Sequence, residues 1–409
     1  MNFFLFSTWL FIVIGILVAF LMLIVLPIKV HKRRKKKLAQ KIARWRKKHP
    51  HEDYDPDEHR APGLFRFIGF LIKAALFIGI LGGAIGYLPY RHNVEMNLAC
   101  QEKFLSEPPY GQKVQVFDEN INVVIEGEGD EVLILYPTAK LPTPYLYYKP
   151  LISALTSTFK VVTVEPFGYG LSDSTTRERT LENVVIELHE VVSSLGFDHY
   201  SILTDGFGGI PIMEYIDMYE TEVKAYFNID TLIGALNKQY NFVGDFDNFG
   251  WLNRAFQFTG YQRLISQIKV DAILPQTDYE YSNEDKELYR QMILTYSDTA
   301  NQLEEITKGP EWCTASKRAY TSANVPNCSF VSSDFITYVS DLIGLADKTE
   351  ITYTLHGETK TIPADAFWTA VHDNPLNEKN KTSIIQGKHI AISCYQDIAS
   401  KMLAWFETI

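Results

Sequence analysis

Two long apolar stretches open the chain. Residues 3–27 carry no charge and are mostly Phe, Leu, Ile and Val, and residues 67–90 are interrupted only by Lys73. Each stretch is long enough to cross a hydrocarbon core of about 30 Å as a helix. The pattern predicts transmembrane helices at 1–28 and 64–90, separated by a basic loop at 29–63. Because the basic residues follow the first stretch instead of preceding it, the pattern is not that of a signal peptide.

After a predicted linker at 91–111, a domain over 112–409 shows short β-type runs bounded by turn residues. These runs are Lys113–Phe117, Ile121–Ile125, Val132–Tyr136, Lys160–Val164, Tyr200–Leu203, Lys224–Ile229, Cys328–Val331 and Ser383–Gln386. From the third run onward they alternate with helix-like stretches at Tyr145–Ser157, Leu181–Leu195, Ile210–Tyr219 and Gln396–Phe406. This alternation predicts an α/β fold with a mostly parallel sheet covered on both faces, and the first two runs predict an antiparallel hairpin at its edge.

Residues 231–320 show no strand pattern, and the apolar spacing in Trp251–Ile268 and Lys286–Ile306 is helical. We therefore expect a helical cap here. Its aromatic residues favour an apolar ligand: Phe242, Phe246, Phe249, Trp251, Phe256, Phe258 and Tyr261. A further hairpin is predicted from Glu350–Leu355 and Thr359–Ile362.

Charge is distributed unevenly. The first 90 residues hold 15 of the 39 basic and 5 of the 49 acidic residues, so this part is near +10 and the remainder, with 24 basic and 44 acidic residues, is near −20. The positive-inside bias places the basic loop in the cytoplasm and both chain ends outside the membrane. Leu38, Ile42 and Trp45 at helical spacing would let this loop contact anionic lipid, although a topology signal is the simpler interpretation.

The acidic outer domain disfavours nucleic acid as a partner. It has no phosphate-binding glycine loop and no metal-ligand spacing, so we expect neither cofactor nor metal. The four cysteines are Cys100, Cys313, Cys328 and Cys394. Their scattered positions show no disulfide framework, and they leave open whether any pair is bridged.

Two glycine-containing segments carry a resemblance to a known superfamily. Ile202 to Gly209 leads from a predicted strand into a predicted helix, with Thr204, Gly206, Gly208 and Gly209 in the pattern small-x-nucleophile-x-Gly-Gly. Glu165 to Asp173 is similar to the pattern D-x-x-G-x-G-x-S, with Glu165 in place of the acid. Both segments resemble the α/β-hydrolase superfamily, in which the first forms the nucleophile elbow.

The resemblance implies a site in which chain order is nucleophile, acid, histidine. It assigns Gly206 to the nucleophile position, Asp334 to the acid and His389 to the histidine, with the backbone amides of Phe207 and Thr138 as oxyanion donors. Glycine has no atom with which to attack, and Pro137 stands where the superfamily usually has glycine. The expected site is therefore a degenerate one.

Three functions fit these observations. The first is a membrane-anchored, extracytoplasmic pseudo-hydrolase that binds a small apolar ligand or a peptide, on the surface of a bacterial cell. The second is a working ester or amide hydrolase, in which His389 and Asp334 activate water or Asp205 serves as an atypical nucleophile. The third is a scaffold component that binds a membrane-protein partner. The identity of the ligand and the oligomeric state are left open.

Overall fold

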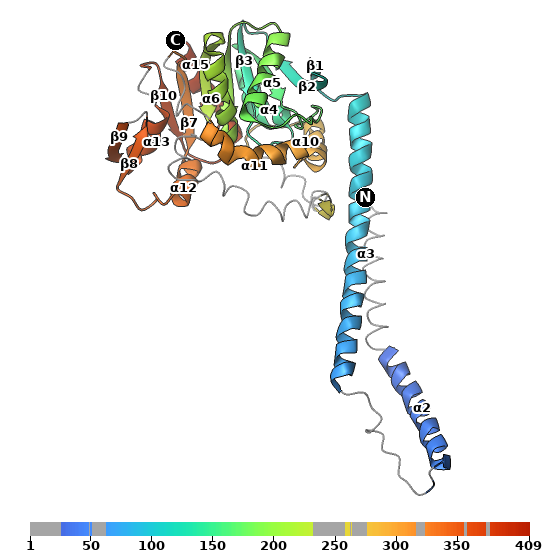
Figure 1. The fold of residues 1–409 in the computed structure, drawn as a ribbon. Coiled ribbons are helices and arrows are strands. Elements are labelled where there is room, and N and C mark those ends of the chain that lie inside the picture. The colour runs from blue at the N-terminus through green and yellow to red at the C-terminus, as the bar shows by residue number, and fades with distance from the viewer. Residues whose placement is uncertain are drawn as a thin grey trace. The chain divides into compact units, whose positions relative to one another are not determined.

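The computed structural model describes residues 26–48, 50, 63–231, 258–261, 263, 276–315, 324–355, 358–373 and 377–409. The chain divides into two compact units, Met1–His92 and Asn93–Ile409. The second unit contains the predicted outer domain (Figure 1).

An eight-stranded sheet forms the centre of the second unit, in the order β1-β2-β4-β3-β5-β6-β7-β10. Its strands are β1 (Gln112–Val116), β2 (Glu119–Glu126), β3 (Glu131–Tyr136), β4 (Phe159–Glu165), β5 (Tyr200–Asp205), β6 (Val223–Ile229), β7 (Asn327–Ser332) and β10 (Lys381–Ile385). β2 pairs antiparallel with both β1 and β4, and the other pairs are parallel. The predicted hairpin and the mostly parallel sheet are confirmed.

Helices cover both faces of this sheet, because alternate strand residues point to opposite sides. On one face, Leu133 and Phe227 belong to a core with α4 (Pro144–Leu155), α14 (Ile390–Ser393) and α15 (Tyr395–Phe406). On the other face, Ile134 and Tyr226 belong to a core with α5 (Leu181–Ser194) and α6 (Gly209–Met218). The result is a three-layer arrangement (Figure 1).

Two helices of the predicted cap are described, α10 (Asn283–Tyr296) and α11 (Ala300–Ala315), and they lie across one end of the sheet (Figure 1). Most of the aromatic cap residues named above lie outside the described residues. The segment after β7 adds α12 (Ser333–Leu342), the predicted hairpin of β8 (Glu350–Leu355) and β9 (Glu358–Pro363), and α13 (Ala364–His372). Ile351, Tyr353, Phe367 and Trp368 bury the inner side of this hairpin.

The N-terminal part contains α2 (Leu26–Lys48) and α3 (Gly63–Ser106). The first predicted span lies almost entirely outside the described residues, and the second falls within α3. In the parts of the chain that the structure describes, no helix combines the length and the apolar run that a membrane span requires.

Two predicted loops are partly helical. The basic loop is helical as far as Lys48, and the predicted linker is helical as far as Ser106. The polar composition of 91–111 concealed this helix, whose Phe104 is buried and stacks on Tyr296 of α10. None of the described cysteines, Cys100, Cys313, Cys328 and Cys394, forms a disulfide.

Candidate functional site

The predicted elbow forms a sharp strand-to-helix turn with a glycine at its apex. β5 ends at Asp205, Gly206 takes a φ of +54°, and a 3₁₀ turn, η2 (Gly206–Gly208), leads into α6. A left-handed φ of this kind is costly for any residue with a Cβ. A Cβ on Gly206 would lie 2.8 Å from the hydroxyl oxygen of Thr138. A side chain at position 206 would therefore require the Thr138 hydroxyl to move.

Both backbone amides predicted to form an oxyanion hole are engaged by side-chain hydroxyls. The Phe207 N–H donates to Thr138 Oγ1 at 3.3 Å, and the Thr138 N–H donates to the Tyr148 hydroxyl at 3.4 Å. Both contacts are longer than the usual 2.9–3.0 Å, so each is weak. The two amides are nevertheless directed at the protein's own oxygens in this structure, and Tyr148, which the sequence did not single out, holds one of them.

The Tyr148 hydroxyl in turn donates to Asp205 Oδ2 at 3.0 Å. Asp205 is the last residue of β5, in extended conformation, and not the apex of the turn. Burial, together with the negative charge of Asp230, raises the pKa of Asp205 to about 7. Its carboxyl group is therefore partly protonated near neutral pH, which weakens it as a nucleophile and makes it a candidate acid or base.

Asp230 also lies at the site, although the sequence pattern did not identify it as a candidate. It directly follows β6, has a φ of +48° and accepts a hydrogen bond from the Ser332 N–H at 2.6 Å. Burial raises its pKa to about 6. Since Asp205 pairs in register with Ile229, the two carboxyl groups come from adjacent ends of parallel strands. An aspartate at the end of a predicted parallel strand was the signal available in the sequence.

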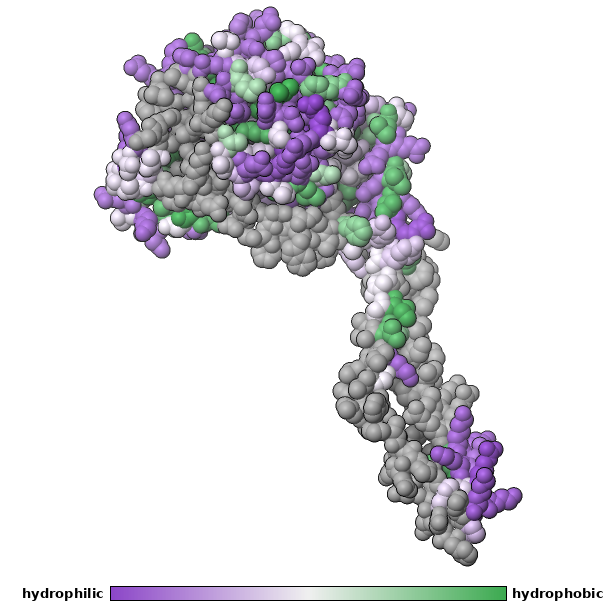
Figure 2. All heavy atoms as spheres, in the orientation of Figure 1, coloured by the Kyte–Doolittle hydropathy of each residue, from purple (hydrophilic) through white to green (hydrophobic). Residues whose placement is uncertain are grey.

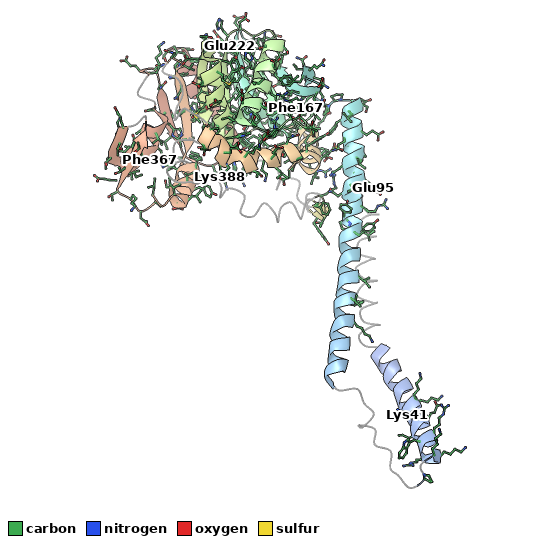
Figure 3. The ribbon with its side chains drawn as sticks, in the orientation of Figure 1. Lys41, Glu95, Phe167, Glu222, Phe367 and Lys388 are labelled. Carbon is green, nitrogen blue, oxygen red and sulfur yellow. The ribbon has the colours of Figure 1, made fainter. Side chains whose placement is uncertain are left out.

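Asp334, in the first turn of α12, and His389, just before α14, lie on neighbouring segments but are not joined. The Asp334 N–H donates to the carbonyl of Gly387 at 3.3 Å, and the Gly387 N–H donates to Ser333 Oγ at 3.0 Å. Both side chains are exposed, and Lys388, labelled in Figure 3, marks the loop that carries His389. Among the described residues, no hydrogen bond or ion pair links the His389 ring to Asp334. The predicted acid and histidine are thus near each other in the fold without forming an oriented pair.

Helix α11 packs beside the elbow and is held there by a buried ion pair, a hydrogen bond and an aromatic contact. The fully buried Arg179 donates to Glu187 at 2.6 Å and to Glu305 of α11 at 2.7 Å, and Tyr169 donates to Glu305 at 2.6 Å. Trp312 of α11 packs against Phe207, with ring centroids 5.6 Å apart. A small void of about 10 Å³, lined in part by Tyr169, Phe207 and Trp312, lies beside the elbow.

The second motif proves structural. Glu165 is buried and accepts hydrogen bonds from the Leu171 N–H at 2.8 Å, from Asn122 Nδ2 at 3.0 Å and from the Tyr110 hydroxyl at 3.0 Å. A Cβ on Gly170, whose φ is +49°, would lie 1.9 Å from the Glu165 carboxylate. Glycine is required there because the turn closes directly over this buried group.

Solved structures with a similar arrangement include plant epoxide hydrolases. The epoxide hydrolase VrEH1 from Vigna radiata is 16% identical with a TM-score of 0.52, covering 73% of this chain and 98% of that chain. A mutant Vigna radiata epoxide hydrolase is 14% identical with a TM-score of 0.52 and the same coverage. Likeness at this identity shows the fold, so the second unit has the α/β-hydrolase fold.

Sequence comparison adds one relative. The uncharacterized protein YbdG of Bacillus subtilis (strain 168) is 25% identical over 131 residues, which is 32% of this chain and 39% of that protein. The match thus spans well under half the length of this relative. No family model matches the sequence.

Proposed function

We propose that the chain is a membrane-anchored, extracytoplasmic pseudo-hydrolase whose α/β-hydrolase domain binds a small apolar ligand or a peptide. One observation carries the proposal: the nucleophile position is Gly206, and the Thr138 hydroxyl lies 2.8 Å from the place of its missing Cβ. Without a nucleophile, a site of this type retains only what binding and the oxyanion hole contribute. Here the oxyanion amides also donate to Thr138 and Tyr148.

The chemistry of the site supports a largely uncharged ligand. Asp205 is partly neutral near pH 7, because burial raises its pKa to about 7. A charged ligand would face the same desolvation that keeps this carboxyl group protonated. The apolar stretches 3–27 and 67–90 support the membrane anchor, and the excess of basic residues between them supports the outward orientation of the domain.

The test combines an activity-based probe with a repaired elbow. The chain would be treated with a fluorophosphonate probe and with short- and medium-chain aryl esters, using a working serine hydrolase as positive control. We expect neither labelling nor turnover in the wild type, and weaker labelling in Gly206→Ser than in the double variant below, because a serine at position 206 must displace the Thr138 hydroxyl. Gly206→Ser combined with Thr138→Gly frees the space and the Phe207 amide, and labelling of this variant would demonstrate an intact pocket.

A second candidate is a hydrolase that activates water through Asp205, and the pKa of about 7 favours it because such a group suits a general base near neutral pH. Turnover of an aryl ester by the wild type would refute the pseudo-hydrolase. Loss of that turnover in Asp205→Asn would then assign the base, whereas loss in His389→Ala would assign it to the histidine instead.

A further inference from the structure

Helix α2 has a basic composition that a topology signal alone does not require. Its 23 residues include 12 Lys and Arg and no acidic residue. Figure 2 shows the strongly hydrophilic residues gathered over this helix, and Figure 3 shows Lys41 projecting from it. The positive-inside bias depends on the number of basic residues and needs neither a helix nor an apolar side. The continuous helix therefore calls for a separate explanation.

The helix also has an apolar stripe. Leu38, Ile42 and Trp45 are spaced four and three residues apart, which places them on one side of an α-helix. They are half-buried, whereas the described basic side chains around them, Lys36, Lys37, Lys41, Arg44, Arg46, Lys47 and Lys48, are exposed. Long basic side chains beside such a stripe can extend their charged ends to phosphate groups while their stems cover apolar surface.

We propose that the part of α2 over residues 36–48, beyond the predicted span, lies in the plane of a membrane surface and binds anionic phospholipid. In this arrangement Leu38, Ile42 and Trp45 insert at the boundary between headgroups and acyl chains, and the flanking Lys and Arg side chains contact headgroup phosphates. Charge complementarity identifies the occupant, because each basic side chain near an anionic surface contributes about fivefold in affinity. The stripe with its tryptophan favours lipid over nucleic acid, since a nucleic-acid surface offers no apolar layer to receive it.

The experiment places an environment-sensitive fluorophore on each side of α2 in the full chain. Ile42→Cys tests the stripe, and Gln40→Cys, an exposed position on the opposite side, is the matched control. Both would be made in a chain whose four cysteines, none of which forms a disulfide, are replaced by alanine, with folding checked by circular dichroism. The labelled chains would be reconstituted into vesicles of phosphatidylcholine alone or of equal parts phosphatidylcholine and phosphatidylglycerol.

We expect the label at position 42 to become brighter and shift to the blue in the anionic vesicles only, with the label at position 40 unchanged. Added salt should reverse the effect, since a Debye length of about 3 Å at 1 M screens surface charge. Removing two charges, as Lys41→Gln with Arg46→Gln, should raise the anionic lipid fraction needed for the half-maximal response.

Three results would overturn the proposal: equal responses at positions 40 and 42, equal responses in both kinds of vesicle, or displacement of the label from anionic vesicles by duplex DNA. The last would identify a nucleic-acid surface instead. These outcomes are independent of the proposed pseudo-hydrolase, which is judged by probe labelling of the outer domain. Resistance of the chain to extraction from membranes at alkaline pH tests the membrane anchor separately. If the chain resists extraction while the label at position 42 shows no fluorescence change, the membrane anchor stands and only the lipid-binding role of α2 fails.

Discussion

Replacing Asp205 by asparagine should stabilise the domain at neutral and alkaline pH. The pKa of Asp205 rises from its ordinary 3.8 to about 7 on folding, mainly through burial. Below pH 3.8 the carboxyl group is protonated in both states and costs nothing. Between pH 3.8 and about 7 the unfolded chain loses this proton before the folded one, so the free energy of unfolding falls as pH rises. At about 1.4 kcal/mol for each pH unit, the total loss is at most about 4 kcal/mol.

Asparagine keeps an oxygen for the Tyr148 hydroxyl and removes this titration. We therefore expect Asp205→Asn to match the wild type at pH 4 and to gain progressively up to pH 8. Urea denaturation of residues 93–409, followed by tryptophan fluorescence across this range, measures the difference. Asp198→Asn, at an exposed position, is the control. If the stability curves of wild type and Asp205→Asn run parallel from pH 4 to 8, burial does not hold the Asp205 carboxyl group protonated, and the raised pKa of Asp205 is refuted.

Three further predictions concern Gly206 in the elbow, Arg179 in its buried ion pairs with Glu187 and Glu305, and His372 in α13. Gly206→Ala should lower the free energy of unfolding by about 1–2 kcal/mol because of the left-handed φ at this position. The loss should exceed that of Gly196→Ala, since Gly196 also has a positive φ but has open space around it. The difference between the two urea midpoints measures the contact with Thr138. Arg179→Met should lower the free energy of unfolding by about 3–5 kcal/mol, because it leaves buried carboxylates unpaired, whereas Lys401→Ala, in an exposed pair, should change it little. Burial lowers the pKa of His372, so the contribution of the neutral ring to stability is complete above the ordinary pKa of 6.5 and is lost as pH falls below that value. His372→Gln should therefore flatten the decline of the thermal midpoint between pH 7 and 5. An unchanged decline would contradict this.

The fold could be predicted from the sequence because its signals are local. Alternation of β-branched runs with amphipathic helices specifies a parallel sheet, and the paired glycines of 204–209 and 168–170 specify two tight turns at known places in it. Gly206 and Gly170 do take positive φ values, and the predicted strands and helices of the sheet are confirmed. The same local logic showed that the nucleophile position carries no reactive atom.

The state of the site was decided by tertiary contacts that no local pattern encodes. The contact of Thr138 with position 206 joins residues that are 68 positions apart, and the hydrogen bonds of Tyr148 to Thr138 and Asp205 depend on how α4 packs on the sheet. Asp230 becomes a partner of Asp205 only because β5 and β6 are neighbours in register. Burial, which raises the pKa of both carboxyl groups, is likewise a property of the packed molecule, since a residue's distance from water depends on every element around it. The sequence therefore determined that no side chain stands at the apex of the elbow, and the three-dimensional structure determined which groups surround that position.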